Sequence, residues 1–240
     1  MRLRTAQTPP AAGSSERLGT PGLLRLLQLT SPALPVGAYA YSQGLEWAVS
    51  AGWVKTESDA SDWILGLLTR SLSRVDVPVL ARMYGAWTEP DPSSVSYWSR
   101  VLHANRETHE LQAEEQALGG ALARLLTLLG IGEAESWIAD PHVTFATLFS
   151  LAAVRWEIPM ADAVAGYLWG WTSNQVGAAV KLVPLGQTAG QRILCCAVEA
   201  IPEAARVGLA LGDDEIGALL PGVAMASALH ETQYSRLFRS

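Results

Sequence analysis

The sequence predicts an all-α protein, a single compact bundle of about ten helices. Apolar residues recur at helical spacing along almost the whole chain. No segment shows the turn-bounded alternation of apolar and polar residues that a hairpin requires, and no repeat of fixed period is present. A chain of 240 residues can bury most of its unfolded surface in one core, so a single domain without disulfide staples is expected.

We divide the chain into three parts. Residues 1–20 are rich in Pro, Ser, Thr, Gly and Ala and are expected to be a flexible lead-in. Residues 21–229 carry the helical periodicity and are expected to form the all-helical domain. Residues 230–240 (HETQYSRLFRS) combine aromatic side chains with arginines, which are common in binding hot spots. We therefore expect a docking tail that becomes ordered on a partner.

Start and stop residues delimit the predicted helices of the first half. The first helix begins near Leu23 and ends before Pro32, because the residue preceding a proline avoids helical backbone. The second runs from about Tyr41 to Ala51, where a glycine follows. Thr56 and Asp59 resemble a capping pair for the third. The later helices of this half carry apolar faces made by Leu80, Met83, Tyr84 and Trp87, with Pro78 in the first turn; by Val95, Trp98, Val101 and Leu102; and by Leu118, Leu122, Leu125, Leu126 and Leu129.

Prolines delimit the helices of the second half. Asp140 followed by Pro141 resembles an N-cap and a first-turn proline, so a helix through Trp156 is expected to begin there. Pro159 restarts the chain into a long helix toward Leu182. The remaining helices are expected over about 188–200, from Pro202 to Leu211, after Asp213 as a cap, and from Pro221-Gly222 through Leu229.

Composition and charge exclude several classes of function. The net charge is −6 and the chain has only Lys55 and Lys181 as lysines, so it lacks the basic stripe of a nucleic-acid-binding protein. It shows neither a long apolar span nor the apolar core of a signal peptide, so we expect no membrane contact and a cytoplasmic location. Charged residues make up 17% and nine residues are tryptophan, which fits either a generous core or sizeable partner interfaces.

Motifs of catalysis and nucleotide binding are absent. The stretch Gly186–Arg192 (GQTAGQR) has three residues between its glycines and lacks the Lys-Ser/Thr of a phosphate loop. We interpret it as a turn between helices, with Gly186 at positive φ and Thr188 as a cap. Cys195 and Cys196 point about 100° apart on a helix and are expected to be buried small hydrophobes. No H-E-x-x-H, C-x-x-C or G-x-S-x-G motif occurs, so we expect no catalytic residue and no enzymatic activity.

One polar cluster is a weak candidate for a metal site. His103, Glu107, Glu110 and Glu114 are spaced by four, three and four residues, so they share one face if the helix is continuous. Carboxylates and imidazole can hold a divalent ion such as nickel, which would suit a metal-dependent enzyme or a metallochaperone acting by itself. The favoured alternative is a solvated, salt-bridged or interface surface. The order of Glu and His also differs from the Glu-x-x-His pairs of metal-binding bundles.

Four blocks of the sequence resemble the UreF family of urease accessory proteins. They occur in the family's order and are well spread along the chain. The blocks are SPALPVGAYAYSQGLEWAV (31–49), RETHELQAEEQALGGAL (106–122), NQVGAAVKLVPLGQTAGQRIL (174–194) and HETQYSRLFRS (230–240).

The resemblance implies a non-catalytic, all-helical scaffold that forms homodimers and needs no cofactor of its own. Such proteins bridge the accessory protein UreD (UreH in some organisms) and the GTPase UreG, regulate that GTPase, and support nickel insertion into apo-urease by the assembled complex. The alternative that remains open is a helical metallochaperone that binds nickel by itself. The resemblance assigns partner contacts to Pro35, Tyr39, Tyr41, Gln43 and Glu46, less firmly to Lys181 and Arg192, and in the tail to Thr232, Gln233, Tyr234, Arg236, Leu237, Phe238 and Arg239.

Overall fold

The computed structural model describes residues 18–240, and within this range it contains ten α-helices and no strand, which confirms the all-α prediction. The predicted lead-in lies outside the described residues up to position 17, and the first helix already begins at Thr20. The helices are α1 (Thr20–Leu29), α2 (Leu45–Ser50), α3 (Glu57–Leu67), α4 (Asp76–Thr88), α5 (Pro92–Ala104), α6 (His109–Leu128), α7 (Phe145–Arg155), α8 (Met160–Leu182), α9 (Gln187–Ala210) and α10 (Pro221–His230). Short turns of helix add η1 (Ala38–Ala40), the π-helical η2 (Leu68–Leu72), η3 (Gly132–Trp137) and η4 (Asp213–Glu215).

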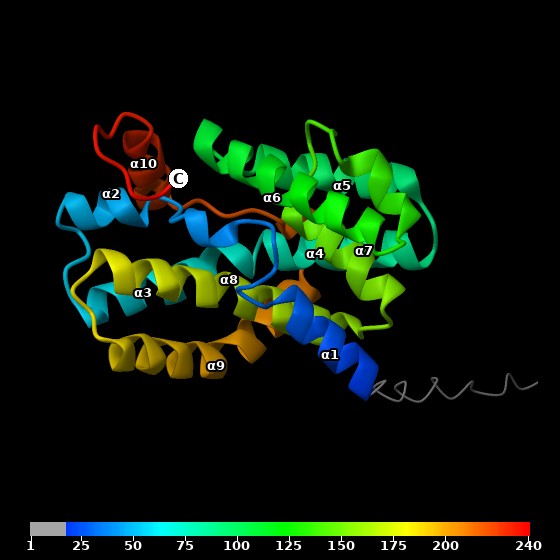
Figure 1. The fold of residues 1–240 in the computed structure, drawn as a ribbon, viewed down its shortest axis with the longest axis horizontal. Coiled ribbons are helices and arrows are strands. Elements are labelled where there is room, and N and C mark those ends of the chain that lie inside the picture. The colour runs from blue at the N-terminus through cyan, green and yellow to red at the C-terminus, as the bar shows by residue number, and fades with distance from the viewer. Residues whose placement is uncertain (1–17) are drawn as a thin grey trace, which may run out of the picture.

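The helices form two groups that share one bundle (Figure 1). One group contains α4, α5, α6 and α7, and the other contains α2, α3, α8 and α9. Contacts of α4 with both α8 and α9 join the two groups. Helix α10 packs on α2 and on α6, and the chain that follows it returns between these two helices. The tail therefore ends at the junction of the two groups.

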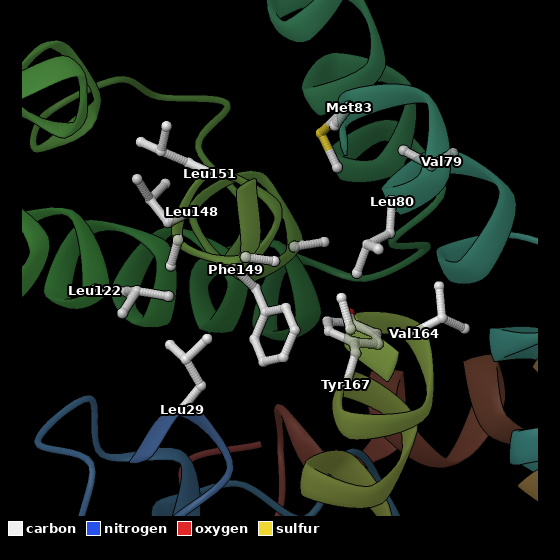
Figure 2. Close-up of a cluster of buried hydrophobic side chains, with 14 of the residues drawn as sticks. Leu29, Val79, Leu80, Met83, Leu122, Leu148, Phe149, Leu151, Val164 and Tyr167 are labelled. Atoms are coloured by element: carbon white, nitrogen blue, oxygen red, sulfur yellow. The ribbon is translucent and has the colours of Figure 1, made fainter. Parts of the chain in front are cut away.

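Two hydrophobic clusters hold the bundle together. In the larger one, Phe149 of α7 is buried and lies among Leu122 of α6, Leu29 of α1 and Tyr167 of α8 (Figure 2). Full burial of such a side chain stabilises the fold by about 1.5–3 kcal/mol. The smaller cluster surrounds α2 and includes Phe238, so the tail contributes to the core of the domain.

Several predicted helix ends are confirmed by their capping contacts. The Oγ1 of Thr56 accepts a hydrogen bond from the backbone N–H of Asp59 at 3.2 Å, and the Asp59 carboxylate accepts one from the N–H of Thr56 at 3.0 Å. This reciprocal pair is a capping box. Pro78 lies in the first turn of α4, and Pro159 directly precedes α8. These ends depend on local contacts, which is why the sequence reveals them.

The predicted starts of helices α2 and α7 are wrong, because both helices begin later in the chain than expected. Helix α2 begins at Leu45 rather than near residue 41, because Gln43 and Gly44 adopt positive φ angles of 53° and 81°, which α-helical backbone does not have. Helix α7 begins at Phe145 because Thr144, rather than Asp140, caps it by accepting from the N–H of Thr147.

Helix α9 is longer than predicted. It continues through Pro202, where the predicted break does not occur. Pro202 has no N–H to donate to the carbonyl of Val198, and Val198 lies on the exposed side of the helix, with 57% of its surface exposed. At its start, Gly186 has φ −74° instead of the expected positive value, and no side chain caps the helix, so Thr188 is not a cap. Cys195 and Cys196 are exposed rather than buried.

The helix expected after Asp213 is also absent. The chain forms only the short turn η4 there and then runs without regular structure until α10 begins at Pro221.

Gly208 provides a test of the packing between α9 and α4. A Cβ at this position would lie 2.4 Å from the carbonyl oxygen of Ser73 and 2.6 Å from the side chain of Val77. We expect Gly208→Ala to lower the free energy of unfolding by about 1–3 kcal/mol, measured by urea denaturation, because the helices must move apart. Gly177→Ala on exposed α8 surface is the control, since nothing lies within 4 Å, and it should stabilise by about 0.5–1 kcal/mol. Equal stability of the two variants would contradict this account of the packing.

Candidate partner-docking site

The turn over residues 35–46 presents one face to solvent and buries the other. Pro35 is exposed and Tyr39 is 64% exposed, whereas Tyr41 and Glu46 are only 7% and 8% exposed. Gly44 makes this geometry possible, because its φ is positive and a Cβ there would lie 2.9 Å from a backbone nitrogen of α10. The turn therefore contributes exposed residues to the surface and places Tyr41 and Glu46 in the interior.

Glu46 anchors the tail to the domain. Its Oε1 accepts a hydrogen bond from the backbone N–H of Leu237 at 2.6 Å, and its Oε2 accepts one from the N–H of Phe238 at 2.8 Å. Hydrogen bonds to an ionised acceptor are short and strong. They place the Phe238 ring in the small cluster around α2, where the Nζ of Lys181 lies 5.6 Å from its centroid.

The backbone of the turn binds the tail as well. The carbonyl of Ala40 accepts from the N–H of Arg239 at 2.8 Å. The carbonyl of Ser240 accepts from the N–H of Ser42 at 2.7 Å and from its hydroxyl at 2.5 Å. The hydroxyl of Ser240 in turn donates to Oε2 of Glu114 at 2.7 Å. Because Ser240 is fully buried, these contacts are shielded from water.

A second group of charges holds the tail at α6. Arg236 donates to Oε1 of Glu110 at 2.6 Å, while Oε2 of Glu110 lies 2.8 Å from Nδ1 of His230. The other ring nitrogen of His230, Nε2, lies 3.2 Å from Oε2 of Glu46. The side chain of His230 is fully buried. The tail is thus connected to α2, α6 and α10 through three charged groups and one imidazole.

Glu114 links the turn, the tail and α8. Its Oε1 accepts from Nε2 of Gln43 at 2.8 Å, and Oε1 of Gln43 accepts from Nε1 of Trp171 at 2.8 Å. Burial raises the pKa of Glu114 to about 7, although the hydrogen bonds from Ser240 and Gln43 act in the opposite direction. The side chain of Glu114 therefore changes between its protonated and ionised forms near neutral pH. A cavity of about 80 Å³ lies beneath the turn, next to Glu114 and Gln43.

Arg106, which also lines this cavity, is the centre of a network of buried ion pairs. It forms ion pairs of 2.6 Å with Asp76 of α4 and with Glu115 of α6, and the hydroxyl of Tyr167 donates to Asp76 at 2.9 Å. Burial alone would lower the pKa of Arg106, but Asp76 and Glu115 raise it well above its usual value. Burial and the charge of Asp76 raise the pKa of Tyr167 as well, so it stays a neutral donor.

The four weak candidates for a metal site, His103, Glu107, Glu110 and Glu114, do not share one helix face. Helix α5 ends at Ala104 and α6 begins at His109 with Thr108 as its N-cap, so the assumed continuous helix is broken. His103 lies on α5 beside Gln116, whose Nε2 is 3.2 Å from the imidazole. Burial and the neighbouring His142 lower the pKa of His103. Within residues 18–240 no group of three or more His, Cys, Asp or Glu side chains could hold a metal ion.

The acidic members of that cluster have other environments. Glu107 is exposed in the turn between α5 and α6, while Glu110 and Glu114 bind the tail. Arg106, four residues before Glu110, binds Asp76 and Glu115. A change of direction of the chain at residues 105–108 causes all of these differences.

The structure brings most of the proposed partner-binding residues together. Lys181 lies against the tail through Phe238, but Arg192 pairs with Glu57 of α3 and lies on α9, on the opposite side of the molecule from α10 (Figure 1). The tail is ordered against its own domain, which differs from the expected ordering on a partner. Its outward side chains include Tyr234 and Leu237, which are 104% and 67% exposed. The remaining tail candidates, Thr232, Gln233 and Arg239, are exposed or partly exposed.

Sequence reasoning missed the buried polar groups that bind the tail and those that bind Arg106. Ser42 and His230 are buried partners, and Asp76 and Glu115 surround Arg106. The available signal was the adjacent pair Glu114-Glu115 in a helix whose other inward positions are apolar, because buried carboxylates require partners.

Comparison with known proteins identifies close relatives over almost the whole chain. The sequence profile of the UreF family matches residues 54–196. The urease accessory protein UreF of Alkalilimnicola ehrlichii is 56% identical over 222 residues, which cover 92% of this chain and 97% of the relative. That of Teredinibacter turnerae is 49% identical over 218 residues, covering 91% and 98%. None of the helices in the described range is long and apolar enough to span a bilayer.

Removal of Arg106 tests the buried ion-pair network. We expect Arg106→Leu to lower the free energy of unfolding by about 3–5 kcal/mol, because Asp76 and Glu115 would remain buried without a counter-charge. Urea denaturation at neutral pH measures the difference. Arg206→Gln is the control, since its pair with Glu203 is exposed on both sides and should change stability by at most about 1 kcal/mol. Similar losses in both variants would argue against a special role for Arg106.

The raised pKa of Glu114 makes a prediction for the pH dependence of stability. A carboxyl whose pKa rises from 4.5 to about 7 on folding binds its proton more tightly in the native state. Its contribution is fully present below about pH 4.5 and is lost as the pH rises to about 7. The stability difference between wild type and Glu114→Gln should therefore shift in favour of the variant by on the order of 3 kcal/mol over this range. A difference independent of pH would contradict the assignment.

Proposed function

Because the chain belongs to the UreF family of urease accessory proteins, we propose that it is a non-catalytic scaffold that joins a UreD-type (UreH-type) protein to the GTPase UreG. In this role it regulates the action of the GTPase and supports nickel insertion into apo-urease by the assembled complex. The observation that carries the proposal is the tail. Its backbone is fixed by Glu46 and its Phe238 is buried, while Tyr234 and Leu237 are directed outward.

We assign the UreD-type partner to an apolar surface on α10 and the tail. This tail surface consists of Met225, Leu229, Tyr234 and Leu237, whose exposed fractions are 53%, 42%, 104% and 67%. Exposed apolar side chains that lie close together mark interaction sites, and tyrosine is enriched among residues that dominate binding energy. Since the domain itself orders the tail, a partner would meet a preformed surface and would lose less entropy on binding.

The GTPase and a second copy of the chain are assigned to other surfaces. The exposed side of the turn, with Pro35 and Tyr39, is available to either of them, next to the point where the carbonyl of Ala40 binds the tail. We assign Lys181 and Arg192 to a surface near the bound GTPase or the seam of a homodimer, as the family resemblance implies. The whole assembly is proposed to work in the cytoplasm, where Cys195 and Cys196 would stay reduced.

A metallochaperone that binds nickel by itself is the second candidate. The oxygens of Glu110 and Glu114 already accept hydrogen bonds from the tail, and His103 is placed on another helix, so the predicted ligand set is dispersed. Calorimetric titration of the isolated chain with nickel tests this alternative. Our proposal expects no saturable binding at one equivalent, whereas a tight stoichiometric site would favour the metallochaperone.

The tail surface is tested by the double substitution Tyr234→Ala and Leu237→Ala. Both side chains are exposed, so the fold should be retained, while affinity for the UreD-type protein should fall at least about tenfold. A pull-down and a urease-activation assay in cells lacking the native UreF measure the two effects. The control is Tyr97→Ala with Leu128→Ala, which removes equally exposed side chains from α5 and α6. Normal activation and partner binding by the tail variant would refute the assignment.

A further inference from the structure

His230 is a buried imidazole with a carboxylate at each ring nitrogen. The Nδ1 atom lies 2.8 Å from Glu110 of α6, and Nε2 lies 3.2 Å from Glu46 of α2. Neither sequence reasoning nor the proposed partner contacts give this residue a role. The position is central, because the same two carboxylates bind the tail.

The hydrogen bonds around the imidazole determine where its protons are. Both oxygens of Glu46 accept backbone N–H groups of the tail. Glu110 accepts from the guanidinium of Arg236 at 2.6 Å, so its other oxygen is the one that faces the ring. A neutral imidazole has one N–H, and its other nitrogen would direct a lone pair at a carboxylate oxygen. Two carboxylate neighbours therefore require two N–H donors.

From this geometry we infer that His230 is an imidazolium that positions Glu46 and Glu110, and through them the tail. The group then contains two carboxylates, one imidazolium and one guanidinium, so its charges balance. Balanced and fully hydrogen-bonded charges are the form in which ionic groups tolerate burial. His230 is a positioning residue, because it acts on the docking surface only through the two carboxylates.

The other charged side chains near His230 have partners of their own and do not contact the imidazole. Glu231, which follows His230, accepts from the backbone N–H of Glu110 rather than approaching the ring. From α8, Lys181 is placed over Phe238, and from α6 Glu114 binds Ser240. Loss of a proton from His230 would place a lone pair against Glu46 or Glu110 and weaken the hold on the tail.

The protonation state is measured directly on the full-length wild-type chain. Nitrogen-15 spectra of the histidine side chains at pH 7 should show both ring nitrogens of His230 protonated. A spectrum in which one ring nitrogen of His230 carries no proton at pH 7 would overturn the inference. This measurement needs no variant and no partner.

The positioning role is measured by release of the tail. Trypsin cleaves after Arg236, and cleavage requires the tail to leave Glu46. We expect His230→Gln to accelerate cleavage after Arg236, followed as the appearance of fragments that begin at Leu237, at least about tenfold at pH 7, since a buried charged hydrogen bond is lost. His142→Gln is the matched control, because that imidazole is 48% exposed and lies at the start of α7 rather than near the tail. Equal cleavage rates in the wild type and both variants would contradict the role.

This inference deepens the proposed function but can fail separately from it. If His230→Gln does not fold, as judged by circular dichroism, the wild-type spectra still decide the protonation state. A chain that shows the imidazolium and slow cleavage but does not bind a UreD-type protein would refute the proposed partner and retain the role of His230. The reverse result, with partner binding and a neutral His230, would refute only the inference.

Discussion

The hydrogen bonds from two consecutive tail amides to the buried carboxylate of Glu46 are the interaction on which the docking site depends. The carboxylate reaches them because Gln43 and Gly44 turn the chain with positive φ and because Gly44 allows close approach of α10. Once the amides are bound, Phe238 enters the cluster around α2 and the next residues pair with the turn. Without this acceptor, the two amides beside the buried Phe238 would lose their hydrogen-bond partner.

Helix α6 connects the docking site to the interior. The consecutive residues Glu114 and Glu115 face different surroundings: Glu114 binds the tail and Gln43, while Glu115 pairs with Arg106 and accepts from the backbone of Phe145. Glu110 binds Arg236 one turn earlier. A displacement of α6 would therefore change the tail contacts and the buried ion pairs together, which offers a physical route between the interior and a bound partner.

Local signals in the sequence predict most of the fold, and long-range contacts account for what they miss. The capping box at Thr56 and the long helix after Pro159 involve neighbours in the chain, so the sequence is sufficient for them. The sequence leaves open whether a helix continues from His103 to Glu114, because an acidic pattern at helical spacing does not reveal a break such as the one before His109. Pro202 remains in a helix, with Val198 one turn earlier on the exposed side, and which side of a helix is exposed is a property that only the packed structure determines.

The candidate site was predicted in its location but not in its internal chemistry. The turn and the tail were both identified as surfaces, yet their contact with each other links residues almost two hundred positions apart, as in the bond between Ser42 and Ser240. The central claim is that the tail is ordered by its own domain before any partner binds. Hydrogen exchange of the isolated chain, followed by mass spectrometry over residues 231–240, tests it most directly. The account predicts that the amides of Leu237 and Phe238 are protected in the absence of partners, and complete exchange of this segment at the rate of an unfolded peptide would contradict it.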